Sequence, residues 1–261
     1  MHKFLVSGAL VGALAACGGG GDGGSVPPPP PPAVYDLVFD NEANDGSRDL
    51  QRVALDGSAA RHVTHAVNAV RPHARPDGRA LVYTSFSTRP LVVPTLMLLA
   101  DFSRPSTVLS SVAGVYEREA VFSPDGRRVA FVSQRDEPEG SDVGGAALRD
   151  GRLEDVRNLT PRTAGSAGLD VTPSWSPDGT QIAFATNREG SDFKLWVMNA
   201  DGSSARPLTA TGPHADVFPT WSPDGRLIAF QRRQGDSYRV GLLPAAGGAP
   251  EADDVGSDRS E

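Results

Sequence analysis

Charged side chains and histidines recur where four similar segments of this chain lead into a Pro-Asp-Gly turn. The residues concerned are Arg71, His73, Arg118, Glu119, Asp170, His214 and Asp216. Arginine and histidine side chains bind anions, whereas carboxylates bind cations and hydrogen-bond donors. If the segments converge on one opening, we expect a charged ring there that binds a peptide, a sugar or an ion. The simpler interpretation, which the sequence leaves open, is that these positions are merely exposed and polar.

Motifs of catalysis and metal binding are missing from the sequence. It contains no Gly-x-Ser-x-Gly nucleophile elbow, no phosphate-binding loop and no His-Glu-x-x-His. His62 and His65 fall at a spacing that places them on opposite faces of an expected strand. The acidic turn at 41–46 lacks the spacing and the late glutamate of a calcium-binding EF-hand loop. We therefore predict no metal, no cofactor and no enzymatic activity.

The four turns are copies of one phrase, which makes this a repeat protein. They lie at 74–78, 122–126, 175–179 and 221–225, and the last two both read Trp-Ser-Pro-Asp-Gly. A spacing of about 50 residues is typical of repeat architectures that stack one supersecondary unit against the next. Proline at the second turn position and glycine at the position with positive φ favour a tight hairpin.

Each unit offers up to four short strands. The second strand of every unit is rich in aliphatic and aromatic residues, which predicts burial on both faces. These segments lie at 36–39, 80–84, 129–133, 182–186 and 227–231. Three units close on a threonine, namely Thr64, Thr160 and Thr209. Four-stranded units at this period indicate a β-propeller, an all-β fold in which first strands line a central channel.

Three stretches, at 173–184, 195–202 and 206–209, closely resemble the WD40-like β-propeller repeat of the TolB protein family. The resemblance covers roughly 35–245 and weakens in the second unit, where Ala-Arg replaces Trp-Ser. It implies a propeller that works in the bacterial cell envelope.

The chain departs from that family in two ways. TolB propellers have six blades and follow a separate α/β domain, whereas only five second-strand segments are present here. The first unit lacks its opening strand, and the last stops after 238–243. We expect about five four-stranded blades, with the first and last incomplete.

The N-terminus predicts export and lipid attachment. Residues 1–16 have a basic start and an apolar stretch that is too short to span a bilayer, which is typical of a signal peptide. This segment ends Leu-Ala-Ala before Cys17, the single cysteine, and so resembles the lipobox of bacterial lipoproteins. The resemblance implies lipidation of Cys17. Because Gly18 rather than aspartate follows, it also implies an outer-membrane anchor that faces the periplasm.

The predicted domain organisation follows from composition. A Gly/Pro-rich tether at 17–33 precedes the propeller at 34–250, and an acidic disordered tail occupies 251–261. The formal net charge of −7 argues against nucleic-acid binding, which needs a basic face.

The sequence favours a monomeric, lipid-anchored scaffold that binds another envelope protein. The alternatives left open are a small-ligand or glycan binder at the channel mouth and, less favoured, a propeller-type lyase or hydrolase. The nucleophile elbow of the prolyl oligopeptidase family, which joins a propeller to a hydrolase domain, is absent.

Overall fold

The computed structural model describes most of the region between Asp36 and Gly248. The described residues are 36–42, 46–54, 60–64, 68–86, 93–102, 105–109, 112, 114–136, 139–162 and 168–248. The predicted leader at 1–16, the tether with Cys17 at 17–33 and the tail at 251–261 lie outside these residues.

The described residues form five antiparallel sheets, here called blades 1 to 5, in which each strand pairs with the next along the chain. Blade 1 consists of β1 (Asp36–Glu42), β2 (Arg48–Ala54) and β3 (Arg61–His62). Blade 2 consists of β4 (Ala69–Ala74), β5 (Leu81–Phe86), β6 (Pro94–Leu99) and β7 (Thr107–Val108). Blade 3 consists of β8 (Glu117–Phe122), β9 (Arg128–Ser133), β10 (Asp142–Arg149) and β11 (Arg152–Asn158). Blade 4 consists of β12 (Asp170–Trp175), β13 (Gln181–Thr186), β14 (Lys194–Asn199) and β15 (Arg206–Pro207). Blade 5 consists of β16 (Ala215–Trp221), β17 (Leu227–Gln234) and β18 (Ser237–Pro244).

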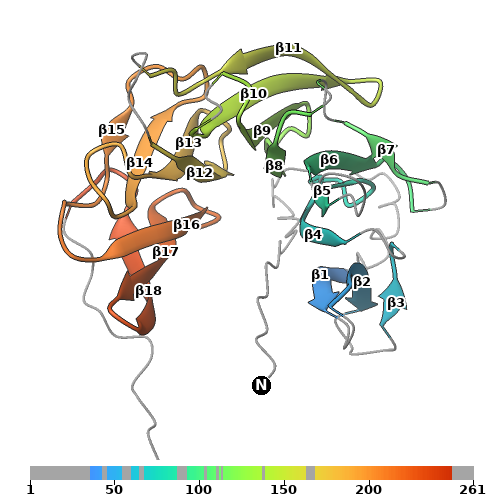
Figure 1. Cartoon of the computed structure of the whole chain (residues 1–261), viewed down its shortest axis with the longest axis horizontal. Helices are drawn as coiled ribbons and strands as arrows, with labels where there is room; N and C mark the ends of the chain where they lie inside the picture. The colour runs from blue at the N-terminus through green and yellow to red at the C-terminus, as the bar shows by residue number, and fades with distance from the viewer. Residues whose placement is uncertain are drawn as a thin grey trace, which may run out of the picture.

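The blades follow one another along an arc, as Figure 1 shows, and each packs against the inner strand of the next blade. Between the described strands of blade 1 and those of blade 5 there is no extended contact. The predicted five-bladed propeller is confirmed, as are its two incomplete ends. Within the described residues, blade 1 has no inner strand and blade 5 no outer one, so each shows three strands.

The Ser-Pro-Asp-Gly turns close the hairpin between first and second strands as their sequence predicts. In blade 4 the Ser176 hydroxyl donates to Asp178, 2.6 Å away, and the Gly179 amide donates to the Ser176 carbonyl with φ of +69° at the glycine. The Ser176 hydroxyl holds the pKa of Asp178 below its ordinary value. In blade 2 the serine is replaced by Arg75, whose guanidinium binds Asp77 through two hydrogen bonds of 2.9 and 2.6 Å. The turn therefore survives the substitution.

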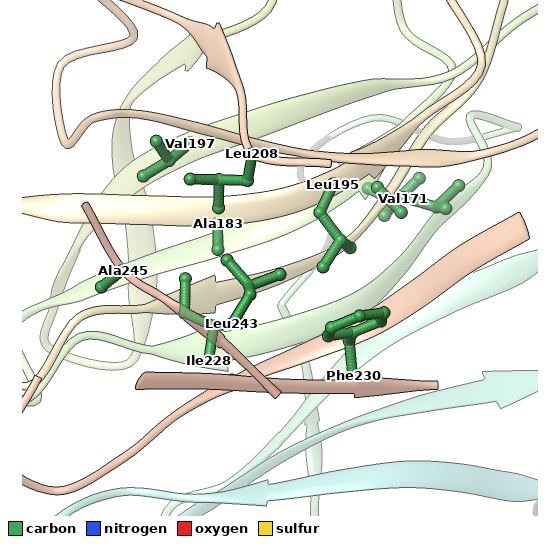
Figure 2. Close-up of a cluster of buried hydrophobic side chains, with 11 residues drawn as sticks. Val171, Ala183, Leu195, Val197, Leu208, Ile228, Phe230, Leu243 and Ala245 are labelled. Atoms are coloured by element: carbon green, nitrogen blue, oxygen red, sulfur yellow. The ribbon is translucent and has the colours of Figure 1, made fainter. Parts of the chain in front are cut away.

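The hydrophobic core lies between blades rather than at the centre of the molecule. Figure 2 shows the cluster between blades 4 and 5, where Ala183 and Leu195 face Phe230 and Leu243. Similar clusters join the earlier pairs of neighbouring blades. Each buried leucine or phenylalanine of this kind contributes about 1.5–3 kcal/mol by leaving water. Adjacent blades are therefore stabilised mainly by contact with each other.

Candidate functional site

A β-bulge interrupts the inner strand of blades 2 to 5 at the same place. The pairing register of each inner strand with its neighbour shifts there by one residue. The bulged residues, all with φ between 53° and 57°, are Arg71, Glu119, Thr172 and Phe218. A positive φ is uncommon for any residue except glycine, and four occurrences at one repeat position mark a feature of the architecture. Bulges of this kind re-aim a side chain.

The bulged residues meet at the axis of the arc, where they form what we call the central cluster. The Glu119 carboxylate accepts a hydrogen bond from the Arg118 guanidinium at 2.9 Å and from the Thr172 amide at 2.9 Å. The Arg71 guanidinium lies 3.6 Å from the same carboxylate and covers the ring of Phe218, with 4.8 Å from its central carbon to the ring centre. The Phe218 amide donates to the Thr172 hydroxyl at 3.4 Å. The central cluster thus connects blades 2, 3, 4 and 5.

A cavity of about 310 Å³ opens beside the central cluster, between blades 1, 2 and 3. Its lining residues are Asp40, Arg48, Val70, Arg71, Thr84, Phe86, Arg118 and Glu119. Arg71 and Arg118 share one carboxylate, and their side chains keep 37% and 27% of their surface exposed, against 12% for Glu119. The cavity therefore presents more cationic than anionic groups to a ligand.

Buried carboxylates occupy the first or second position of the inner strands of blades 3, 4 and 5. Each is fully buried and pairs with an arginine of its own blade. The pairs are Glu117 with Arg135 at 2.8 Å, Asp170 with Arg188 at 2.8 Å and Asp216 with Arg232 at 2.7 Å. These pairs connect the inner strand to the second strand (Arg232) or to the residues just after it (Arg135 and Arg188), and they leave Asp170 and Asp216 with no direct access to a ligand.

Arg162 extends this network across two blades. Its guanidinium lies 2.9 Å from Asp170 in blade 4 and 3.7 Å from Asp142 in blade 3, and it donates to the Ser141 carbonyl at 3.2 Å. The side chains of Arg162, Asp142 and Asp170 are 6%, 4% and 0% exposed. A charge this deeply buried is tolerated only when it is paired, so the three residues form one unit.

The two predicted histidines lie away from the cavity. His73 sits between blades 2 and 3, where its Nδ1 accepts a hydrogen bond from the Phe122 amide at 3.2 Å. Burial lowers the pKa of His73 from 6.5 to about 4, so its ring is neutral at pH 7. His214 lies 3.5 Å from Asp216 at the start of blade 5, and burial lowers its pKa, against the opposing effect of Asp216.

Of the sequence-predicted positions, the structure gathers Arg71, Arg118 and Glu119 at one cavity. It places His73, Asp170, His214 and Asp216 in separate contacts between or within blades. The partners of the buried acids carry a signal that could have been found. Arg135 and Arg188 each follow a second strand by two residues, after Ser133 and Thr186.

No other class of site is indicated by the residues the structure describes. Among them, no group of three or more His, Cys, Asp or Glu side chains is placed to hold a metal ion. None of the same residues belongs to a helix with the length and apolarity needed to cross a membrane.

Comparisons with known proteins agree with this architecture. A stretch of 91 residues is 32% identical to the uncharacterized peptidase YuxL of Bacillus subtilis (strain 168), and covers 33% of this chain and 12% of that protein. A stretch of 148 residues is 28% identical to a protein TolB homolog of Chlorobium luteolum, and covers 56% of this chain and 30% of that one. The chain thus spans less than a third of either relative.

The crystal structure of TolB from Acinetobacter baumannii superposes with a TM-score of 0.67 at 20% identity, over 81% of this chain and 49% of that one. At such an identity the likeness shows the fold alone. Residues 35–251, however, match the family described as the TolB beta propeller domain. Because this region includes all five blades, the chain belongs to the TolB β-propeller domain family.

Proposed function

We propose that this chain is a protein-binding scaffold of the bacterial cell envelope. The observation that carries the proposal is the unfinished arc: blade 5 has no outer strand, and its outward face has no neighbouring blade among the described residues. In blades 2 to 4 both faces are covered by adjacent blades. Uncovered sheet edges and faces favour association with another chain.

The proposal includes the membrane anchor that the sequence predicts. Lipid on Cys17 would hold the protein at the outer membrane, facing the periplasm, and the tether at 17–33 would set the propeller away from the bilayer. The chain would act as a monomer until its partner binds. The resemblance to proteins named TolB supports an envelope location, and the net charge of −7 argues against a nucleic-acid partner.

The proposed scaffold binds without turnover. One relative is described as a peptidase, but this chain covers only 12% of it. The residues that line the cavity include no histidine, cysteine or lysine. A base that activates a nucleophile normally comes from such a group or from a free carboxylate. Of the two lining carboxylates, Glu119 is held by two arginines, which leaves Asp40 as the one available acid.

The proposed scaffold function predicts that the chain binds one specific partner protein in the envelope. We expect chemical crosslinking of intact envelopes to shift the full chain into one complex of defined mass, because a specific interface selects one partner. The Cys17→Ala variant, which cannot carry the lipid, should lose this complex together with membrane association. A chain that stays solitary under crosslinking while fully membrane-bound would contradict the scaffold.

A second candidate function rests on the 310 Å³ cavity. Two arginines that share a single carboxylate can accept a further carboxylate or phosphate group, since guanidinium pairs with such groups through parallel hydrogen bonds. The ligand would be a small anion or an acidic glycan. The affinity of the native chain and of Glu119→Gln for a small dicarboxylate tests this candidate.

A further inference from the structure

We propose that the outer edge of β18 receives one extended segment of a partner protein, and that this segment carries an aliphatic residue followed by threonine or serine. The inference deepens the proposed scaffold function and rests on it. It comes from a contact that the other blades repeat and that blade 5 leaves unmade.

In the other blades, a short segment of the chain itself fills the outer edge of the third strand. Its aliphatic residue donates its amide to the carbonyl of one third-strand residue. These hydrogen bonds run from Val63 to Leu50 at 2.8 Å, from Leu109 to Leu96 at 2.8 Å, from Leu159 to Val143 at 2.8 Å and from Leu208 to Leu195 at 2.7 Å. We call this pair of residues, the aliphatic residue and the one after it, the plug.

The second residue of the plug completes the contact through its hydroxyl group. In blade 1 the Leu50 amide donates to the Thr64 hydroxyl at 2.9 Å. Equivalent bonds reach Thr160 from Val143 at 3.0 Å and Thr209 from Leu195 at 3.0 Å. One plug therefore satisfies both the amide and the carbonyl of the third-strand residue. Buried backbone groups need such partners.

In blade 5 the corresponding residue is Val240. It pairs with Gln231 on the second strand just as Leu195 pairs with Ala185 in blade 4. Leu50, Leu96, Val143 and Leu195 are all 0% exposed, whereas Val240 is 52% exposed. Among the described residues, no backbone amide of an outer strand donates to Val240. The outer edge of β18 at Val240 is therefore a position for a plug that no described residue occupies.

The surface next to this edge suits an aliphatic side chain. Adjacent side chains of a strand point to opposite faces, and Leu243 belongs to the core between blades 4 and 5. Val240 and Leu242 therefore lie on the face of blade 5 that points away from blade 4. Tyr238 lies on the same face and is 62% exposed. In blade 4 the plug residue Leu208 is only 5% exposed beside Leu195. Leu195 shares its cluster with Phe230 and Leu243 of blade 5 as well as with Leu208, so an incoming aliphatic residue would cover Val240 from the strand edge only.

The occupant belongs to another protein, because neither 18–35 nor 249–261 offers a plug and the one such pair nearer the N-terminus, Val6-Ser7, falls in the predicted leader. The N-terminal stretch at 18–35 contains six consecutive prolines, which lack amide donors, and no aliphatic residue followed by threonine or serine. The C-terminal stretch at 249–261 contains no such pair either. In a second copy, the plugs of the described blades already occupy their own edges. Addition of a strand from a partner is a recurrent mode of peptide recognition.

A synthetic peptide tests the edge directly. The probe is a fluorescent peptide with the sequence of residues 203–211, Ser-Ser-Ala-Arg-Pro-Leu-Thr-Ala-Thr, which contains the plug of blade 4. We expect saturable binding to the full chain, measured by fluorescence polarisation. Val240→Pro, which removes the amide, and Val240→Lys, which places a charge on the edge, should each weaken binding at least about tenfold. Val108→Lys, on the exposed but already paired strand β7, should leave binding unchanged.

Two controls define what would overturn the inference. A peptide with aspartate in place of the leucine should not bind, and melting temperatures must show that the Val240 variants are folded. Absence of binding to the native chain, or equal binding to folded Val240→Lys, would refute the edge site.

Photo-crosslinking in envelopes separates this inference from the scaffold proposal. With a benzophenone amino acid in place of Tyr238, we expect a crosslink to a partner segment that contains the aliphatic–Thr or aliphatic–Ser pair. A crosslink to a second copy or to the chain's own termini would refute the proposed occupant. A partner that is captured equally well by Val240→Lys would refute the edge but leave the scaffold standing. If the probe at Tyr238 captures nothing while chemical crosslinking still yields a complex, the edge is refuted and the scaffold stands; if neither method captures a partner, both proposals fail.

Discussion

Replacement of Arg162 by alanine is expected to lower the free energy of unfolding by about 3–5 kcal/mol, the cost of removing one partner from a buried ion pair. Arg162 is the cation that joins Asp142 of blade 3 to Asp170 of blade 4, and all three side chains are nearly inaccessible to water. Without it, Asp142 would lose a buried cationic neighbour and keep the Asn158 amide, which lies 2.8 Å away, as a hydrogen-bond donor. Asp170 would still pair with Arg188. The substitution should therefore weaken mainly the contact between blades 3 and 4.

Chemical denaturation of the full chain measures this loss. Arg149→Ala is the matched control, because Arg149 pairs with Glu154 at 3.5 Å on the surface, with side chains 67% and 51% exposed. Exposed pairs of this kind contribute about 0–1 kcal/mol. If Arg162→Ala and Arg149→Ala lower the free energy of unfolding by the same small amount, Arg162 does not connect the blades. Arg162→Met, which removes the charge but keeps most of the volume, separates the loss of the ion pair from the loss of packing.

Replacement of Glu119 should affect both stability and ligand binding. Glu119→Ala removes the acceptor of the Thr172 amide and the shared partner of Arg71 and Arg118, and we expect it to cost about 3 kcal/mol. Glu119→Gln keeps an acceptor for the amide but removes the carboxylate that the two arginines share. The cavity then becomes more cationic. If it binds small anions, the affinity for succinate should rise about tenfold, since 1.4 kcal/mol corresponds to a factor of ten.

Isothermal titration calorimetry with succinate, and with the uncharged succinamide as the control ligand, measures this effect. Glu154→Gln provides a control on the protein side, because it removes an exposed carboxylate outside the cavity. The cavity would be excluded as an anion site if neither the native chain nor Glu119→Gln distinguished succinate from succinamide. A larger cost for Glu119→Gln than for Glu119→Ala would contradict the assigned role of the carboxylate as an acceptor.

The architecture could be predicted because its signals are local. The turn at 175–179 needs proline, aspartate and glycine at fixed positions, and each repeat of the phrase adds one hairpin. The last described blade was also predicted to stop after 238–243, because residues 244–261 contain no second turn followed by a closing threonine. Even so, the threonine that closes each unit only marked the repeat. Its hydroxyl contact with the third strand, as between Thr209 and Leu195, emerged from the structure.

The candidate site was predicted only in part because its geometry comes from the bulges. Arg71, Glu119, Thr172 and Phe218 share a backbone conformation but no chemical character, so their common role has no sequence pattern. His73 was placed at the mouth by its position in the repeat. The bulge two residues earlier changes which side chains face the axis, and His73 turns instead towards Phe122.

Residues that pair with two different blades could not be predicted from the sequence either. Arg162 lies between two units, after the closing threonine of one and before the first strand of the next, where the sequence has no repeated pattern. Its partners Asp142 and Asp170 are separated in the chain and meet only because blades 3 and 4 pack together. Long-range ion pairs of this kind need the three-dimensional arrangement.

Amide hydrogen exchange at the third strands tests the central claim, an arc that ends in an unfilled edge. Leu195 and Val240 occupy equivalent positions, but only the Leu195 amide has a plug hydroxyl as its partner. We predict that the Val240 amide of the isolated full chain exchanges at least about 100-fold faster than that of Leu195, because exposed and unpaired amides exchange without unfolding. Equal protection of the two amides would show that the edge of blade 5 is already occupied, and would contradict the account.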